Sequence, residues 1–295
     1  GSWAATVSAS SESLPGEWLY PAKRAAEKTQ ATVVNVVGNK NDIVQFHSDL
    51  AKIRVKETSE LVKDPNKVQI ASKIVQELKA EIKIINTKLG EIKTTPNSGS
   101  EVVKNINQNA KEIKGVLEGV KDNLLVVNDA TTTGDLSKQV SEVKNLVKDM
   151  AVQTVEIMVV KHQQGDRGVS KEEVKQAISD QLDSAVADAK QSNQSVVEVN
   201  NAVNIVKTEA GVVSSNATGA PSIKDNKAIT DKIEVTSKQT QAAVSSAQAF
   251  STEAGKTASE GQTLLSQDNF AQAVGKIKEA NDVSARVEQI SDNAI

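Results

Sequence analysis

Apolar residues recur along most of this chain at alternating steps of three and four, the heptad spacing of helices that pack along a seam. Three segments follow it without a fault: Val68, Ala71, Val75, Leu78, Ile82, Ile85, Leu89 and Ile92; Val103, Ile106, Ala110, Ile113, Leu117, Val120, Leu124 and Val127; and Leu136, Val140, Val143, Val147, Met150, Thr154 and Ile157. The pattern predicts amphipathic α-helices and excludes a sheet as the main architecture.

Two longer seams follow in the second half of the chain. The first comprises Ile178, Leu182, Ala185, Ala189, Ser192, Val196, Val199, Val203, Val206, Ala210 and Val213, and the second Ile229, Ile233, Thr236, Thr240, Ala243, Ala247, Phe250, Ala254, Thr257, Gly261 and Leu264. The second seam is smaller and partly polar, so each of its layers buries little apolar area.

The helices are separated by clusters of turn-forming residues. Clusters of Gly, Pro, Asn, Asp, Ser and Thr predict loops at 94–99, 129–135, 163–168 and 214–222, with weaker breaks at 38–42 and 64–65 and a bend near 266–268. Loops this short favour antiparallel packing of consecutive helices. We expect an all-α, elongated antiparallel helical bundle with coiled-coil packing. It forms one domain over residues 1–295, and residues 1–15 are a flexible N-terminal segment.

Composition narrows the possible functions. Hydrophobic residues make up 38% of the chain but aromatic residues only 2%, which suits helix seams better than ligand pockets. The 35 basic and 38 acidic residues are interspersed, so we expect no nucleic-acid partner. Cysteine is absent, which excludes disulfides and thiolate chemistry. The longest apolar run, Val155 to Val160, is interrupted by Glu156 and is too short to span a membrane.

The residue types that carry catalysis or bind cofactors do not form a recognisable pattern. His47 and His162 are far apart and have no partner at metal-ligand spacing. Glu77 and Glu81 lie beside lysines, as expected for a solvated helix face. The serines show no nucleophile elbow, and no glycine cluster forms a phosphate loop. We therefore expect no catalytic, cofactor or metal site, and a protein that is not an enzyme.

Two N-glycosylation sequons are candidate modification sites. Asn216 begins the sequence Asn-Ala-Thr in an expected loop, and Asn193 begins Asn-Gln-Ser on a long expected helix, beside the seam residue Ser192. Both matter only in a secreted protein, and Asn216 is the better candidate. At the N-terminus, Trp3, Trp18 and Tyr20 are expected to plug one end of the bundle, with an exposed partner anchor as the alternative.

The segment Gly16 to Ala26, which reads GEWLYPAKRAA, and the long Ala/Val/Thr/Lys helices after it resemble the ectodomains of trypanosome surface glycoproteins. The helical-bundle group in question includes the metacyclic invariant surface proteins, the alanine-rich and glutamate/alanine-rich epimastigote proteins and, more distantly, the variant surface glycoproteins. The resemblance implies a non-enzymatic coat glycoprotein on a parasite surface, held to the membrane by a C-terminal GPI anchor outside these residues. It also implies a host or vector protein as a ligand of the membrane-distal end.

A second class of protein, the intracellular adaptor rods, remains open. The Ala/Ser/Thr-rich stretch Gln239 to Ala249 resembles cytoskeletal adaptor rods built from helix bundles, which implies an intracellular location instead. Because several segments of one chain share the heptads, the seams can satisfy one another internally. We expect a monomer, with a weak dimer as the alternative.

Overall fold

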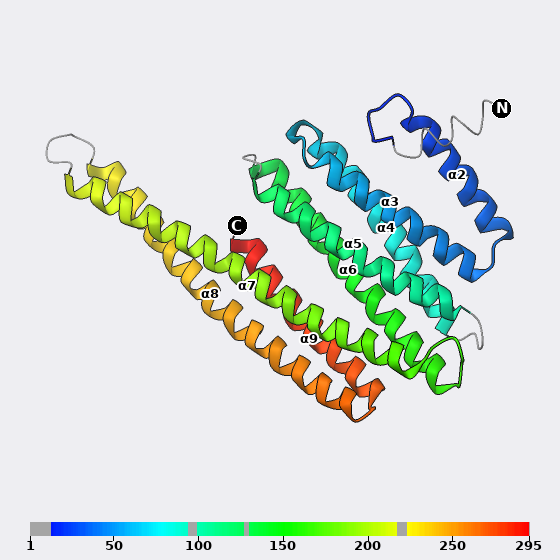
Figure 1. Cartoon of the computed structure of the whole chain (residues 1–295). Coiled ribbons are helices and arrows are strands. Elements are labelled where there is room, and N and C mark those ends of the chain that lie inside the picture. The colour runs from blue at the N-terminus through cyan, green and yellow to red at the C-terminus, as the bar shows by residue number, and fades with distance from the viewer. Residues whose placement is uncertain (1–12, 94–98, 127–129, 217–222, 295) are drawn as a thin grey trace. The chain divides into compact units, whose positions relative to one another are not determined.

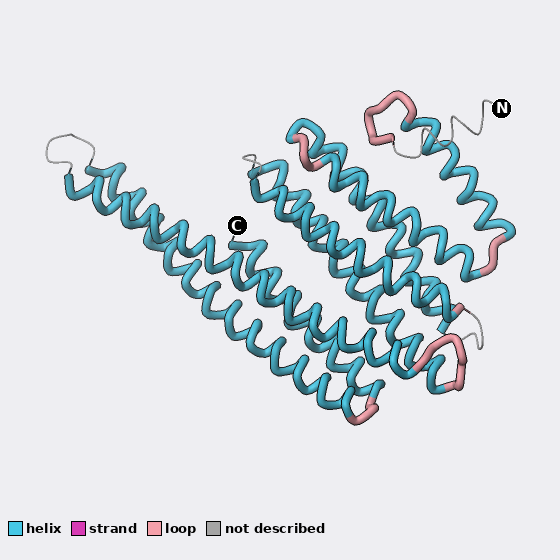
Figure 2. Tube along the Cα trace, viewed as in Figure 1, coloured by secondary structure: helices cyan, strands magenta, loops and turns pink. Residues whose placement is uncertain are grey.

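The computed structural model describes residues 13–93, 99–126, 130–216 and 223–294, and most of them are helical. These residues form eight α-helices and one 3₁₀ helix, joined by short turns, and contain no strand (Figure 2). The chain divides into two compact units, residues 1–175 and residues 176–295, and each is described by itself. The all-helical bundle expected from the heptads is confirmed, whereas the single domain over 1–295 and the supercoil of its helices stay predictions.

Five α-helices belong to the first unit (Figure 1). They are α2 (Tyr20–Val37), α3 (Lys40–Leu61), α4 (Val68–Lys93), α5 (Ser100–Val126) and α6 (Ala130–Gln163), and a 3₁₀ helix, η1 (Pro65–Lys67), precedes α4. Helices α3, α4, α6 and α5 form a four-helix bundle in which each packs on two neighbours, and α2 packs on α3. Of the expected flexible segment 1–15, residues 1–12 lie outside the described residues, while the buried Ser13 accepts a hydrogen bond from Lys23 Nζ at 3.1 Å.

The order of helices in this bundle differs from the expected chain of antiparallel neighbours. Helices α3 and α4, and α5 and α6, do pack in antiparallel pairs, but α4 and α5 are not among the well-packed pairs. Helix α5 instead packs parallel to α3, since Ser48 contacts Asn109 and Lys52 contacts Glu112. The loop length sets the direction of α5, but burial of its apolar seam decides which helices it contacts.

The seams fill the interior of the bundle. Every residue of the Val68–Ile92 seam is buried, as is every residue of the Val103 seam up to Leu124 and of the Leu136–Ile157 seam. Val127 lies outside the described residues. Apart from Thr154, whose hydroxyl donates to Asn107 Oδ1, these side chains are apolar, and burial of their area stabilises the bundle. The burial predicted for these three seams is therefore confirmed within the described residues.

Helix ends follow the turn chemistry in most places. Asn39 caps α3 through a capping box with Asp42, and the Asp64 side chain caps η1, as the weak breaks indicated. Helix α6 ends at Gln163, within the expected loop 163–168. One loop was placed wrongly, because α6 begins at Ala130, so most of 129–135 is helical. Thr and Asp cluster there, but they occupy the first turns of a helix, where polar side chains are tolerated.

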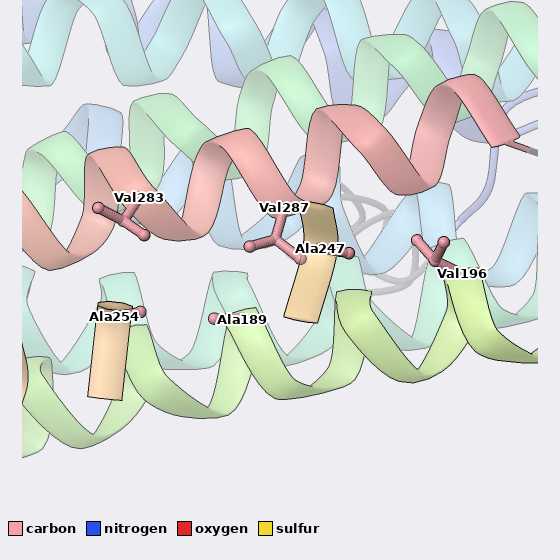
Figure 3. Close-up of a cluster of buried hydrophobic side chains, with 6 residues drawn as sticks. All are labelled: Ala189, Val196, Ala247, Ala254, Val283 and Val287. Atoms are coloured by element: carbon pink, nitrogen blue, oxygen red, sulfur yellow. The ribbon is translucent and has the colours of Figure 1, made fainter. Parts of the chain in front are cut away.

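Three long helices make up the second unit: α7 (Lys171–Asn216), which begins at the end of the first unit's range, α8 (Ile223–Ser266) and α9 (Phe270–Ala294). Helices α7 and α8 are antiparallel, since Ser179 meets Gln262 and Asn200 meets Thr240. Their shared core consists of small residues from all three helices (Figure 3): Ala189 and Val196 of α7, Ala247 and Ala254 of α8, and Val283 and Val287 of α9. The expected bend near 266–268 is confirmed, because α8 ends at Ser266.

Helix α9 is much shorter than the two helices that it covers. At 1.5 Å per residue, α9 is about 38 Å long, whereas α7 and α8 each exceed about 65 Å. In Figure 1 the C-terminal end of α9 lies partway along the α7–α8 pair. We call the part beyond this end the arm, residues 200–216 of α7 and 223–239 of α8. There the second unit is two helices thick instead of three.

Two glycines of α8, Gly255 and Gly261, differ in how closely other side chains approach them. A Cβ added at Gly261 would lie 2.7 Å from Leu182 Cδ2 and 3.1 Å from Lys276 Cβ, whereas a Cβ at Gly255 meets nothing within 4 Å. We predict that Gly255→Ala raises the free energy of unfolding by up to about 1 kcal/mol through helix propensity. Gly261→Ala lowers it by about 1 kcal/mol, because the core must shift. Urea denaturation measures both, and equal gains in the two variants would contradict the close contact.

Candidate functional site

Six charged side chains meet where three helices of the first unit come together. This α2 ion cluster consists of Lys23, Arg24 and Glu27 of α2, Arg54 and Glu57 of α3, and Glu77 of α4. The buried residues of α2 are Lys23 and Glu27. A surface helix ordinarily docks through an apolar stripe. Helix α2 instead docks through charges.

Arg54 lies at the centre of the α2 ion cluster and is only 1% exposed. Its Nη1 donates to Glu57 Oε2 at 2.9 Å, its Nε lies 2.9 Å from Glu77 Oε2, and its Nη2 pairs with Glu27. Lys23 Nζ lies 2.7 Å from the other oxygen of Glu57. Three cations thus face three anions, and this balance offsets the cost of removing the charges from water.

Burial changes the acidity of the groups in and beside the cluster. It raises the pKa of Glu27 to about 7, against the opposing effect of the Arg24 charge. Burial also raises the pKa of Glu57 and that of Glu77. The pKa of the Tyr20 hydroxyl is raised by burial and by the negative charge of Glu57. The cluster therefore takes up protons more readily than solvated carboxylates do.

The raised pKa of Glu27 predicts how stability depends on pH. The folded value of about 7 exceeds the ordinary value of 4.5. Stability from such a group is fully present below the unfolded pKa and is lost as pH rises through the folded pKa. We predict that the free energy of unfolding contributed by Glu27 falls by about 2 to 3 kcal/mol as pH rises from about 4.5 to about 7. Chemical denaturation at a series of pH values measures it.

Two glutamine variants separate this effect from general titration. Glu27→Gln cannot titrate and should flatten the decline. Glu112 pairs with Lys52 at 2.7 Å, and its pKa is lowered mainly by a hydrogen bond from that lysine. Its titration acts at lower pH, so Glu112→Gln should leave the decline in place. An unchanged slope in Glu27→Gln would contradict the assignment.

A further polar contact, between a histidine and a carboxylate, lies between α3 and α4. His47 Nδ1 lies 2.5 Å from Glu81 Oε2, and the histidine is buried. The expected solvated face is therefore wrong for Glu81, whereas the Glu77 side chain is 38% exposed, and neither residue pairs as expected with lysines of its own helix. Their partners, Arg54 and His47, come from α3, and the spacing of charges within α4 alone cannot reveal them. His162 is half-buried, with Nδ1 3.3 Å from the carbonyl oxygen of Val169.

Large apolar side chains are exposed on the arm. The seam is buried under α9 as far as Val196, but Val206 on the same seam is 51% exposed, and Ile229, on the α8 seam, is 55% exposed. Ile205 and Val235 beside them are exposed as well. The seam burial expected at Val206 and Ile229 is thus wrong. Their register is helical as predicted, but the covering helix ends before it reaches them.

Polar side chains fix the register of the two helices of the arm. Thr240 Oγ1 donates to Asn200 Oδ1 at 3.0 Å, and Ser237 Oγ donates to Asn204 Oδ1 at 3.1 Å. A shallow hollow on α7 runs alongside; it is lined by Asn201, Asn204, Ile205, Thr208 and Glu209. The arm thus combines defined polar contacts inside with apolar side chains outside.

Helix α2 and the turn before it carry the other exposed large apolar side chains of the described residues. Val33, Val36 and Val37 are exposed near the C-terminal end of α2. Trp18 is 86% exposed, so the expected plug is wrong for this residue, and Tyr20 is only partly buried. Trp3 lies outside the described residues. Tyr20 instead lies against the α2 ion cluster, with its hydroxyl 3.5 Å from Glu57 Oε2.

The two sequons fall on the same long helix. Asn216 is the last residue of α7, next to a segment outside the described residues. Asn193 lies in the interior of α7 and is partly buried. The structure places the two asparagines far apart on one helix and does not bring them together in a site. Their occupancy stays a prediction.

Within the described residues, no group of three or more His, Cys, Asp or Glu side chains is arranged to hold a metal ion. None of the described helices is long and apolar enough to cross a bilayer.

Comparison with known proteins gives one match. A family described as "Domain of unknown function (DUF5667)" matches residues 12–124, less than half of the chain. The matched segment contains every residue of the α2 ion cluster and runs from α2 into α5. No curated protein and no solved structure matches the chain.

Proposed function

We propose that the chain is a non-enzymatic display protein whose helix bundles hold apolar binding surfaces in solvent. One observation carries the proposal. Seam side chains fill the bundle interiors, while the exposed large apolar side chains of the described residues fall on the arm and on α2 with the turn before it. Exposed apolar groups of this kind are typical of surfaces that bind another macromolecule.

The location at a cell surface is the second part of the proposal. It rests on the resemblance of Gly16 to Ala26 and of the long helices to trypanosome coat glycoproteins. On this account a lipid anchor outside these residues holds the protein at a parasite surface, and the sequon at Asn216 carries a glycan. The ligand is a host or vector protein.

Labelling of intact native cells tests the location. Lys238 has a side chain 74% exposed and lies on the arm. A membrane-impermeant amine reagent should modify it before the cells are lysed, and mass spectrometry should find a glycan on Asn216. Labelling only after lysis, with an unmodified Asn216, would overturn the surface location and favour the intracellular rod.

A further inference from the structure

The apolar face of α7 and α8 that α9 covers in the core of the second unit continues onto the arm. Val196 is buried in the core that α7, α8 and α9 share. Val199, Val203 and Val206 follow it at steps of three, four and three, so they lie along the same face of α7. On α8, Thr240 and Ile229 belong to one heptad seam and so lie along the same face. Thr240 is buried, whereas Ile229 is exposed. The face is therefore built to be covered, and α9 stops short of covering it.

We propose that this face of the arm binds the same face of a second copy of the chain. Two arms placed antiparallel, face to face, make a four-helix bundle with two-fold symmetry. Each arm then takes the place along the partner that α9 takes within the chain. This inference rests on the proposed binding role of the arm and names its partner.

Charge and length both favour a second copy. Between 200 and 209 and between 229 and 239, three basic residues, Lys207, Lys232 and Lys238, are balanced by three acidic residues, Glu209, Asp231 and Glu234. Two such surfaces do not repel each other. Two identical arms also have the same length. In an antiparallel pair, each arm therefore extends as far as the end of the partner's α9.

The area of the contact predicts its strength. An arm about 25 Å long and two helices wide covers about 500 Å² per copy. The total of about 1,000 Å² lies below the 1,200 to 2,000 Å² that is typical of stable interfaces. The pairing is therefore weak and reversible, with a dissociation constant in the micromolar range or above.

Sedimentation of the full chain from about 1 μM to about 300 μM tests the pairing. The mean mass should rise toward that of a dimer. Val206→Asp and Ile229→Asp should each weaken the association at least about tenfold, because each places a charge in an apolar contact. Both side chains are exposed in the single chain, so circular dichroism should show unchanged folding. Val37→Asp, on the exposed end of α2, should leave the association unchanged.

Cysteine cross-linking tests the geometry separately, since the natural chain has no cysteine. Under mild oxidation, Val206→Cys should form a disulfide-linked dimer at least about ten times faster than Gln191→Cys, which is exposed on α7 beside the part that α9 covers. A monomer at every concentration, or equal cross-linking of the two variants, would overturn the inference. Either result leaves the surface location standing, which intact-cell labelling decides independently.

Discussion

Arg54→Ala lowers the free energy of unfolding by about 3 to 5 kcal/mol. The guanidinium is buried and pairs with Glu27, Glu57 and Glu77. Its removal leaves buried carboxylates without their central partner, and the cost of an uncompensated buried charge exceeds that of the lost contacts. Urea denaturation followed by circular dichroism measures the change.

Two further variants make this result specific. Arg54→Lys keeps the charge but cannot reach three carboxylates with one planar group, so it should recover only part of the loss. Lys63→Ala breaks an exposed pair with Glu60 in the same unit, and it should change stability little. Similar stabilities for Arg54→Ala and Lys63→Ala would contradict the role of the α2 ion cluster.

Leu182→Asp lowers the free energy of unfolding by about 4 kcal/mol or more. Leu182 is fully buried on the α7 seam, and its methyl groups lie where Gly261 leaves space for them. The aspartate would place an unpaired charge in that core. Thermal unfolding followed by circular dichroism measures the loss.

The same substitution farther along α7 tests where the covering helix ends. Val203 is only partly buried, so Val203→Asp should cost clearly less than Leu182→Asp, although both residues hold seam positions. Gln191 is exposed, and Gln191→Asp should have little effect. Equal losses at Leu182 and Val203 would mean that the face beyond α9 is covered in the folded protein.

The sequence predicts the helices and their buried faces because heptad spacing records burial directly. In α4, each seam residue from Val68 to Ile92 is buried as expected. The break before α3 could be predicted as well, since Asn39 and Asp42 form a capping box that is local in sequence. Features of this kind depend on neighbours within one or two turns.

Contacts between distant segments could not be predicted in this way. Arg54 occurs amid other charged residues, and its spacing alone does not distinguish a buried guanidinium from a solvated one. Its partners Glu27 and Glu77 lie on two other helices. Likewise, the valines of α7 keep the heptad pattern through Val206, but the end of α9 decides which of them are covered. Local spacing records the face of a helix, whereas burial depends on the helix that packs against it.

Hydrogen exchange along α7 tests the central claim most directly, namely that the arm extends beyond its covering helix. In dilute protein, amides of residues 178–196 should be strongly protected, and those of 203–209 should exchange at least about a hundredfold faster. The change in protection should fall between Val196, which packs in the core shared with α9, and Val206, which is exposed. Uniform protection from Ile178 to Glu209 at the same low concentration would contradict the account.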